Sequence, residues 1–159
     1  SNKMSAPAVK TILLSGLVAG ALDIATATTF HSIKNGSFLC ERILKYVASG
    51  AFGKAAFDGG ADMLVAGLAF HFIIAFSFAI FYFFIFSHVD FLPQQKIVSG
   101  LLYGLFAWCV MNLIVVPLSN ISRAPLTLAK SIPEMIILMF CISLPISLIV
   151  HRHYTTGKK

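Results

Sequence analysis

The sequence predicts an all-α integral membrane protein: a four-helix transmembrane bundle with an interfacial amphipathic helix between the first and second spans. Three observations carry this prediction. Hydrophobic residues make up 58% of the chain and charged residues 11%, whereas soluble domains carry about 25% charged residues. The mean hydropathy is +0.88. The apolar residues also gather into four stretches, each long enough to cross a hydrocarbon core of about 30 Å. We therefore expect a single membrane domain over residues 1–159.

The four spans are expected at about residues 9–30, 63–86, 97–118 and 131–150. In lipid, every backbone polar group has to be hydrogen bonded within the protein, so each apolar segment crosses as a helix. Four crossings place both chain ends on one side of the membrane. A competing interpretation of the first span is a secretory signal that ends near Ala25-Thr26-Ala27. Against it, the apolar run continues past Asp23 to Phe30.

The long connection between the first two spans contains the expected interfacial helix, at about residues 37–50. Ser37 is a suitable N-cap, and Glu41 lies in the first turn, where the helix dipole favours a carboxylate. Apolar residues fall on one face and charged residues on the other, as in helices that lie along a membrane surface. We expect Arg42 and Lys45 to contact that lipid surface. The alternative is a soluble hairpin packed on the ends of the spanning helices.

The charge of the chain indicates a lipid surface as its electrostatic partner. There are 12 Lys and Arg against 6 Asp and Glu, a net charge of +6. With so little polar surface, this excess favours anionic lipid over nucleic acid. Six basic residues fall on each side of the membrane, so the positive-inside rule does not decide the orientation. We expect both termini in the cytoplasm, because the basic residues of the first loop can bind lipid on either face.

Four polar side chains interrupt the spans at similar depths. They are Asp23, His71, Asn112 and Glu134. Counting at 1.5 Å per residue puts all of them roughly 18 to 25 Å from the side that carries the termini. A charged side chain near the bilayer centre costs about 2.5–3.5 kcal/mol on insertion scales. Each of these residues therefore needs a partner or a function.

Small residues indicate which faces of the spans pack together. The glycines expected at helix contacts are Gly16, Gly20, Gly67, Gly100 and Gly104. Such residues, three or four apart, let helix backbones approach closely. Asp23 shares a helical face with Gly20, and His71 shares one with Gly67, so both faces are expected to point into the bundle. Asp23 and His71 would then face each other across a helix contact.

Prolines interrupt the last two spans. Pro117 lies near the end of the third span, and Pro133 and Pro145 lie in the fourth. A proline inside a helix removes one hydrogen bond and clashes with the carbonyl four residues earlier. Pro145 is therefore expected to free the carbonyl of Cys141 and to give a kink or a polar spot in the core.

Two interpretations of the polar layer stay open. In the functional one, polar side chains line a cavity that binds a small solute or cation, or passes protons between carboxylate and imidazole. These side chains are Asp23, Thr26, His71, Asn112 and Glu134. In the structural one, Asp23 and His71 form a pair that locks two helices, worth about 0.6 kcal/mol. Asn112 would likewise lock helices, and Glu134 would lie at a helix start, where the dipole favours it.

Motifs for catalysis or for a cofactor are missing from the sequence. The three cysteines show no CxxC spacing, and there is no HExxH, glycine-rich phosphate loop or Ser/His/Asp arrangement. His31 and His71 differ by roughly 12 Å in depth, which excludes haem bound between two histidines. We therefore expect no enzyme activity, no metal and no cofactor.

A set of short strings runs along nearly the whole chain. They are Gly16-Leu-Val-Ala-Gly20, Ala48-Ser-Gly50, Ala55-Ala-Phe57, Gly59-Gly60, Ala69-Phe-His71-Phe72, Gly100, Tyr103-Gly104, Met111-Asn112 and Val116-Pro117-Leu118-Ser119. Together they resemble small uncharacterised bacterial inner-membrane proteins loosely related to the YagU type. The resemblance implies a four-helix inner-membrane protein and no particular activity. It draws attention to Gly59-Gly60, His71, Asn112 and Pro117, and it is weakest in the fourth span.

The expected function is to bind or translocate a small solute, ion or proton in a buried polar cavity. Four spans are few for a complete pathway, so we expect a homo-oligomer. The alternative is a non-catalytic scaffold or accessory subunit that binds a membrane partner or lipid through the first loop. Membrane lipids are expected partners in either case, and nucleic acid is not.

Overall fold

The computed structural model describes residues 5–36, 40–123 and 125–156. Over these residues the chain forms helices and no strand, which confirms the all-α class. Four of the described helical stretches are long and apolar enough to cross a membrane. Their bounds, with those of the shorter helices, are α1 Ala6–Asn35, α2 Cys40–Phe52, α3 Ala55–Asp58, α4 Ala61–Ile85, α5 Phe91–Gln94, α6 Lys96–Val110, η1 Met111–Val115, α7 Val116–Leu118, α8 Leu128–Ile137, η2 Leu138–Ser143 and α9 Leu144–Thr156.

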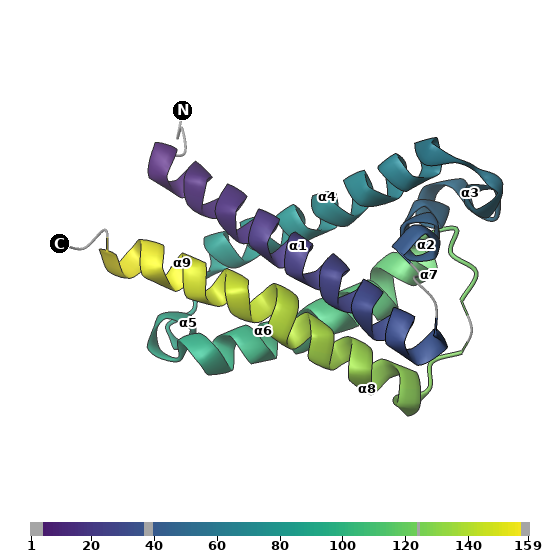
Figure 1. The fold of residues 1–159 in the computed structure, drawn as a ribbon. Coiled ribbons are helices and arrows are strands. Elements are labelled where there is room, and N and C mark those ends of the chain that lie inside the picture. The colour runs from purple at the N-terminus through teal and green to yellow at the C-terminus, as the bar shows by residue number, and fades with distance from the viewer. Residues whose placement is uncertain (1–4, 37–39, 124, 157–159) are drawn as a thin grey trace.

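The long helices form one bundle (Figure 1). The first residues of α1 and the last of α9 lie at the same end of it, so the predicted common side of the termini is observed (Figure 1). We name this end the terminal end, and the opposite end, which carries α2 and α3, the loop end (Figure 1). The first and fourth spans are longer than predicted. Helix α1 continues to Gly36, whose left-handed φ of 69° ends it.

Two of the prolines in the spans, Pro117 and Pro145, lie just after π-helical segments. The π-helix η1 precedes Pro117, and η2 precedes Pro145. A π-turn pairs carbonyls with donors one residue further along, which re-satisfies groups that a proline leaves unpaired. The third and fourth spans therefore stay continuous, and at Pro145, where the sequence predicts a kink or a polar spot, the fourth span has a widened turn instead.

The core of the bundle lies mainly towards the terminal end, and close helix contacts there depend on glycine. A Cβ on Gly104 would meet the Met139 backbone, and one on Gly100 would lie 3.2 Å from the Leu144 Cα. On α1, a Cβ on Gly16 would meet the ring of Phe76, and one on Gly20 would meet the ring of Phe72, both from α4. These four predicted packing positions are therefore contact points between spans.

Gly67 packs differently from the sequence prediction. A Cβ on this residue would meet the backbone of Leu44, which is in α2 and not in the bundle interior. Helix α2 thus lies directly against the N-terminal half of α4. On α2, Lys45 forms a 2.9 Å ion pair with Glu41, and the Lys45 side chain is only 15% exposed. Arg42 is exposed. The predicted N-cap, Ser37, lies outside the described residues.

Candidate functional site

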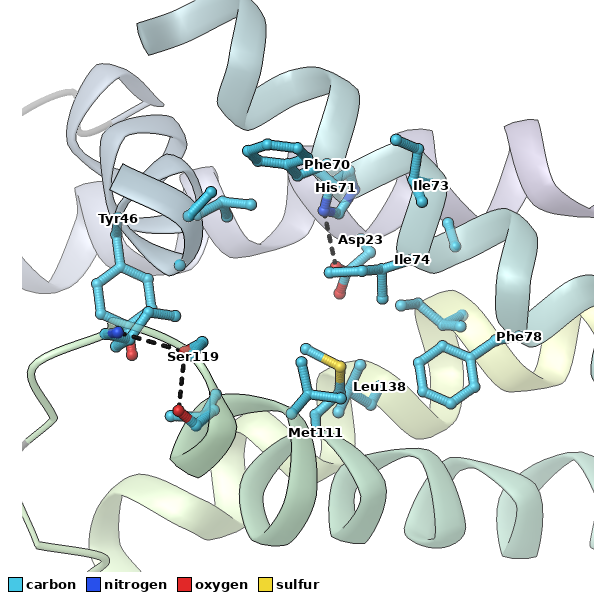
Figure 2. A pocket seen from close by; sticks show the side chains of 18 residues that line it. Asp23, Tyr46, Phe70, His71, Ile73, Ile74, Phe78, Met111, Ser119 and Leu138 are labelled. Carbon is cyan, nitrogen blue, oxygen red and sulfur yellow. Dashed lines mark hydrogen bonds and ion pairs between the residues drawn. The ribbon is translucent and has the colours of Figure 1, made fainter. Parts of the chain in front are cut away.

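The central feature of the site is the meeting of Asp23 on α1 with His71 on α4. The Nδ1 atom of His71 lies 3.9 Å from the Asp23 Oδ2, and the two side chains are 11% and 17% exposed, respectively. Gly20 allows this approach, because its missing side chain leaves space for Ala75 and the ring of Phe72. Figure 2 shows the carboxylate and the imidazole pointing toward each other.

A backbone carbonyl fixes the orientation of the His71 ring. The Nε2 atom lies 2.8 Å from the carbonyl oxygen of Gly20. A carbonyl oxygen can only accept, so Nε2 carries a proton and donates it there. In neutral His71 the Nδ1 atom is then an acceptor directed at Asp23. At 3.9 Å the two groups are too far apart for a direct hydrogen bond. Asp23 and His71 therefore face each other without bonding directly.

Beside the pair lies a cavity of about 410 Å³, enclosed by α1, α2, α4, the η1–α7 stretch and η2 (Figure 2). Its size falls in the range of small-molecule sites. Most of its wall is apolar, and the polar side chains among the described lining residues are those of Asp23, Tyr46, His71 and Ser119. The cavity therefore differs from the predicted polar one: it is a mostly apolar pocket, with a carboxylate from α1 and an imidazole from α4 side by side.

The loop end of this cavity is closed by a contact between α2 and the segment after α7. The backbone N–H of Asn120 donates to the Gly50 carbonyl at 3.0 Å, and the Asn120 side-chain Nδ2 donates to the Ala51 carbonyl at 3.1 Å. Tyr46 of α2 lines the cavity here. Burial raises the pKa of the Tyr46 phenol, nearby Arg123 opposes that shift, and Glu134 adds to it.

Three predicted members of the polar cluster lie elsewhere, and none of them lines the cavity. Thr26 accepts a 3.3 Å bond from the Cys141 thiol. Asn112 donates its amide to the carbonyl of Trp108 on its own helix at 3.0 Å. Because α8 begins at Leu128, Glu134 lies beyond the first turn and not at a helix start as predicted. The similar depth of Asn112 and Glu134 therefore did not bring them to the cavity that Asp23 and His71 line.

A second buried polar group joins α4, α6 and α9 near the terminal end. Tyr82 donates to the Ser147 hydroxyl at 2.8 Å, and Ser147 donates to the Lys96 carbonyl at 2.6 Å. Ser99 lies 3.0 Å from the Tyr82 hydroxyl. All three side chains are buried. We name these residues the hydroxyl network. The sequence analysis missed it, because serine and tyrosine are common in apolar spans and nothing in their spacing shows that they meet.

The chemistry available at the candidate site is binding and proton exchange. Among the described residues, no group of three His, Cys, Asp or Glu side chains is placed to hold a metal ion. The described cysteines are free thiols. Asp23 and His71 remain as one carboxylate and one imidazole that face an apolar space. Such a pair can hold a proton, or a ligand group that donates hydrogen bonds.

The fold and the site together define a multi-pass helical membrane protein with an apolar cavity beside a buried Asp–His pair. In comparisons with known proteins, no family model, no curated protein and no solved structure matches the chain. The resemblance to YagU-type proteins thus stays a prediction from short strings.

Proposed function

We propose that this protein binds a small solute in the cavity beside Asp23 and His71. The observation that carries the proposal is the 3.9 Å gap between the His71 Nδ1 and the Asp23 Oδ2. Both atoms belong to side chains that line the cavity. A polar atom of a bound solute can bridge two such groups.

The alternative role of the pair, a lock between α1 and α4, is less well supported by this geometry. A lock is expected to close with a direct hydrogen bond of about 2.7–3.2 Å. The hydroxyl network does close in this way, at 2.6 to 3.0 Å. Placing a carboxylate within a span costs about 2.5–3.5 kcal/mol, whereas an average interhelical bond returns about 0.6 kcal/mol. Ligand binding gives the carboxylate a function that a lock does not need.

Location and assembly belong to the same proposal. We propose a bacterial inner membrane, supported by the resemblance. Both termini in the cytoplasm stays the expected orientation, because the basic residues of the first loop can bind lipid on either face. The four polar lining side chains do not form a continuous chain of hydrogen-bonding groups through the cavity. Translocation of the solute, ion or proton would therefore need a second copy of the chain, so the proposal for a single copy is binding.

The experiment is ligand-induced stabilisation of the purified protein in nanodiscs, because a ligand that binds the folded state raises its unfolding temperature. Small amphiphiles with cationic, neutral and anionic groups are screened. Asp23→Asn is expected to reduce the shift given by the tightest-binding amphiphile and to keep the unliganded melting temperature. His71→Ala also removes the bond to the Gly20 carbonyl, so it is expected to reduce the shift and to lower the unliganded melting temperature. Asp90→Asn and His88→Ala change exposed groups outside the cavity and serve as matched controls. If the variants only melt earlier and no amphiphile shifts the wild type, the pair is a lock.

A second candidate function, a scaffold that binds a membrane partner or lipid, is favoured by the outer face of α2. Arg42 is exposed there, and Tyr46, one helical turn further on, lines the cavity but is also 40% exposed. A basic group next to an aromatic ring suits a membrane interface or a partner helix. Co-purification of one stoichiometric partner, lost in Arg42→Ala and Lys45→Ala, would favour this function over solute binding.

A further inference from the structure

We propose that the solute is an amphiphilic ammonium compound, an apolar body with one protonated amine, and that it reaches Asp23 and His71 sideways from the bilayer between α4 and α6. This inference rests on the proposed function, since it names the ligand class and the route for the same cavity. Hydrogen-bonding geometry, charge, wall chemistry and a second cavity support it in turn.

The hydrogen-bonding geometry of Asp23 and His71 favours a ligand that donates hydrogen bonds. With Nε2–H of His71 bonded to the Gly20 carbonyl, the Nδ1 atom of the neutral ring is an acceptor, and so is the Asp23 carboxylate. A nitrogen placed about 2.9 Å from each of two atoms 3.9 Å apart bridges them comfortably. An ammonium has donors for both acceptors at once, whereas an alcohol has one donor. The ammonium then joins two acceptors that have no direct hydrogen bond to each other.

The charge balance favours a cation as well. Among the described residues, the ion pairs found within 4.0 Å are Lys45–Glu41 and His71–Asp23, so no lysine or arginine neutralises Asp23. A net negative charge is costly within a membrane, and a bound ammonium cancels it. The lining rings of Tyr46, Phe70 and Phe78 add electron-rich faces that attract cations. An anionic amphiphile would meet repulsion here.

The apolar lining of the cavity indicates that the body of the ligand is apolar, and a second space next to the cavity indicates the route of entry. A second space of about 370 Å³ lies between α4 and the α6–η1 stretch. It shares Ile74, Phe78, Met111 and Val115 with the first cavity. Its outer rim includes Phe81 and Phe106, which are 46% and 43% exposed. Side chains exposed on spanning helices face lipid. Apart from Ser77, the described residues that line the second space are apolar, so the path from the bilayer suits a membrane-dissolved amphiphile.

The test uses three probes with the same apolar body: 4-phenylbutylamine, 4-phenylbutanol and 4-phenylbutyrate. Binding to the full chain in nanodiscs is measured by isothermal titration calorimetry at neutral pH, where the amine is a cation and the acid an anion. We expect the amine to bind at least tenfold tighter than the alcohol, and the acid to bind weakest. Asp23→Asn is expected to remove the preference for the amine while the alcohol still binds.

The outcomes separate the two proposals. If none of the probes binds the wild type, and the nanodisc screen also finds no ligand, the cavity is not a binding site and both proposals fail. If the alcohol or the acid binds as tightly as the amine, or if Asp23→Asn keeps the preference, the site binds solutes but the ammonium assignment is wrong. Retained alcohol binding in Asp23→Asn also shows that this variant is folded.

The route is tested separately with two tryptophan substitutions in η1. Val115 lines both cavities, and its neighbour Ile114 is 52% exposed but lines neither. Val115→Trp is expected to slow the association of the amine at least fivefold by filling the junction between the two spaces. Ile114→Trp adds the same ring to the lipid-facing side and should change the association rate less than twofold. Equal association rates for the two variants would overturn access from the bilayer.

Discussion

The two buried polar groups of this protein lie at different ends of the bundle and differ in whether their bonds are closed. Near the terminal end, the hydroxyl network holds α4, α6 and α9 with bonds of 2.6 to 3.0 Å between neutral groups. Towards the loop end, Asp23 and His71 lie 3.9 Å apart beside a cavity of about 410 Å³. The hydroxyl network bonds its own members, whereas the Asp–His pair leaves acceptors that face the cavity.

The difference separates stability from binding within one bundle. Uncharged hydroxyls can bond helices together without the cost of placing an ion in lipid. Backbone approach at Gly100 and Gly104 surrounds the hydroxyl network with close packing. Around the Asp–His pair, α2 and the η1–α7 stretch stand away from α1 and enclose the cavity instead (Figure 2). We infer that the terminal half supports the fold while the loop half is available for a ligand.

The largest expected effect contrasts a glycine from each region. In Gly104→Ala the new Cβ would clash with the Met139 backbone, which cannot move as a side-chain end can. We expect a loss of about 1–3 kcal/mol in the free energy of unfolding, as for other overpacked cores. In Gly50→Ala the Cβ would lie 3.7 Å from Ile121, an ordinary contact, so this control should be tolerated. Thermal unfolding in detergent compares them, and equal losses would remove the contrast in packing.

The next effect compares the two polar groups directly. Tyr82→Phe deletes the hydroxyl that donates to Ser147 and lies 3.0 Å from Ser99, so we expect a loss of about 1 kcal/mol in unfolding free energy. Asp23→Asn breaks no direct side-chain bond to His71 and should cost less than about 0.6 kcal/mol. Ligand binding should show the reverse order. A larger stability loss for Asp23→Asn than for Tyr82→Phe would make the Asp–His pair a structural element.

The sequence predicted the spans and the closeness of Asp23 and His71 because those features depend on single-helix patterns. Hydropathy marks a span, and small residues mark the faces that approach. What the sequence did not reveal depends on how helices are placed against each other. Outside α4, the nearest backbone to Gly67 is that of Leu44 in α2, because α2 folds back on α4. The apolar nature of the cavity arises from residues of five separate segments, whose meeting no local pattern encodes.

A smaller effect is expected at the contact that closes the loop end of the cavity. Asn120→Ala removes the side-chain bond to the Ala51 carbonyl but keeps the backbone bond to Gly50. Global stability should fall by about 0.5 kcal/mol, at the low end for a partly exposed hydrogen bond. Amide hydrogen exchange should rise in α2 and stay unchanged in α9. Faster exchange throughout the bundle would show that α2 does not open separately from it.

The smallest effect is expected at Asn112, a polar residue that lies within the third span but away from both polar groups. Its amide bonds to the carbonyl of Trp108 on the same helix, so its removal breaks no contact between helices. Asn112→Leu should change the free energy of unfolding by no more than about 0.6 kcal/mol. Because Asn112 does not line the cavity, affinity for 4-phenylbutylamine should stay within twofold of the wild type. A marked loss of affinity would show that Asn112 belongs to the binding site, as the sequence predicts. It would also mean that the η1 turn rearranges when the ligand binds.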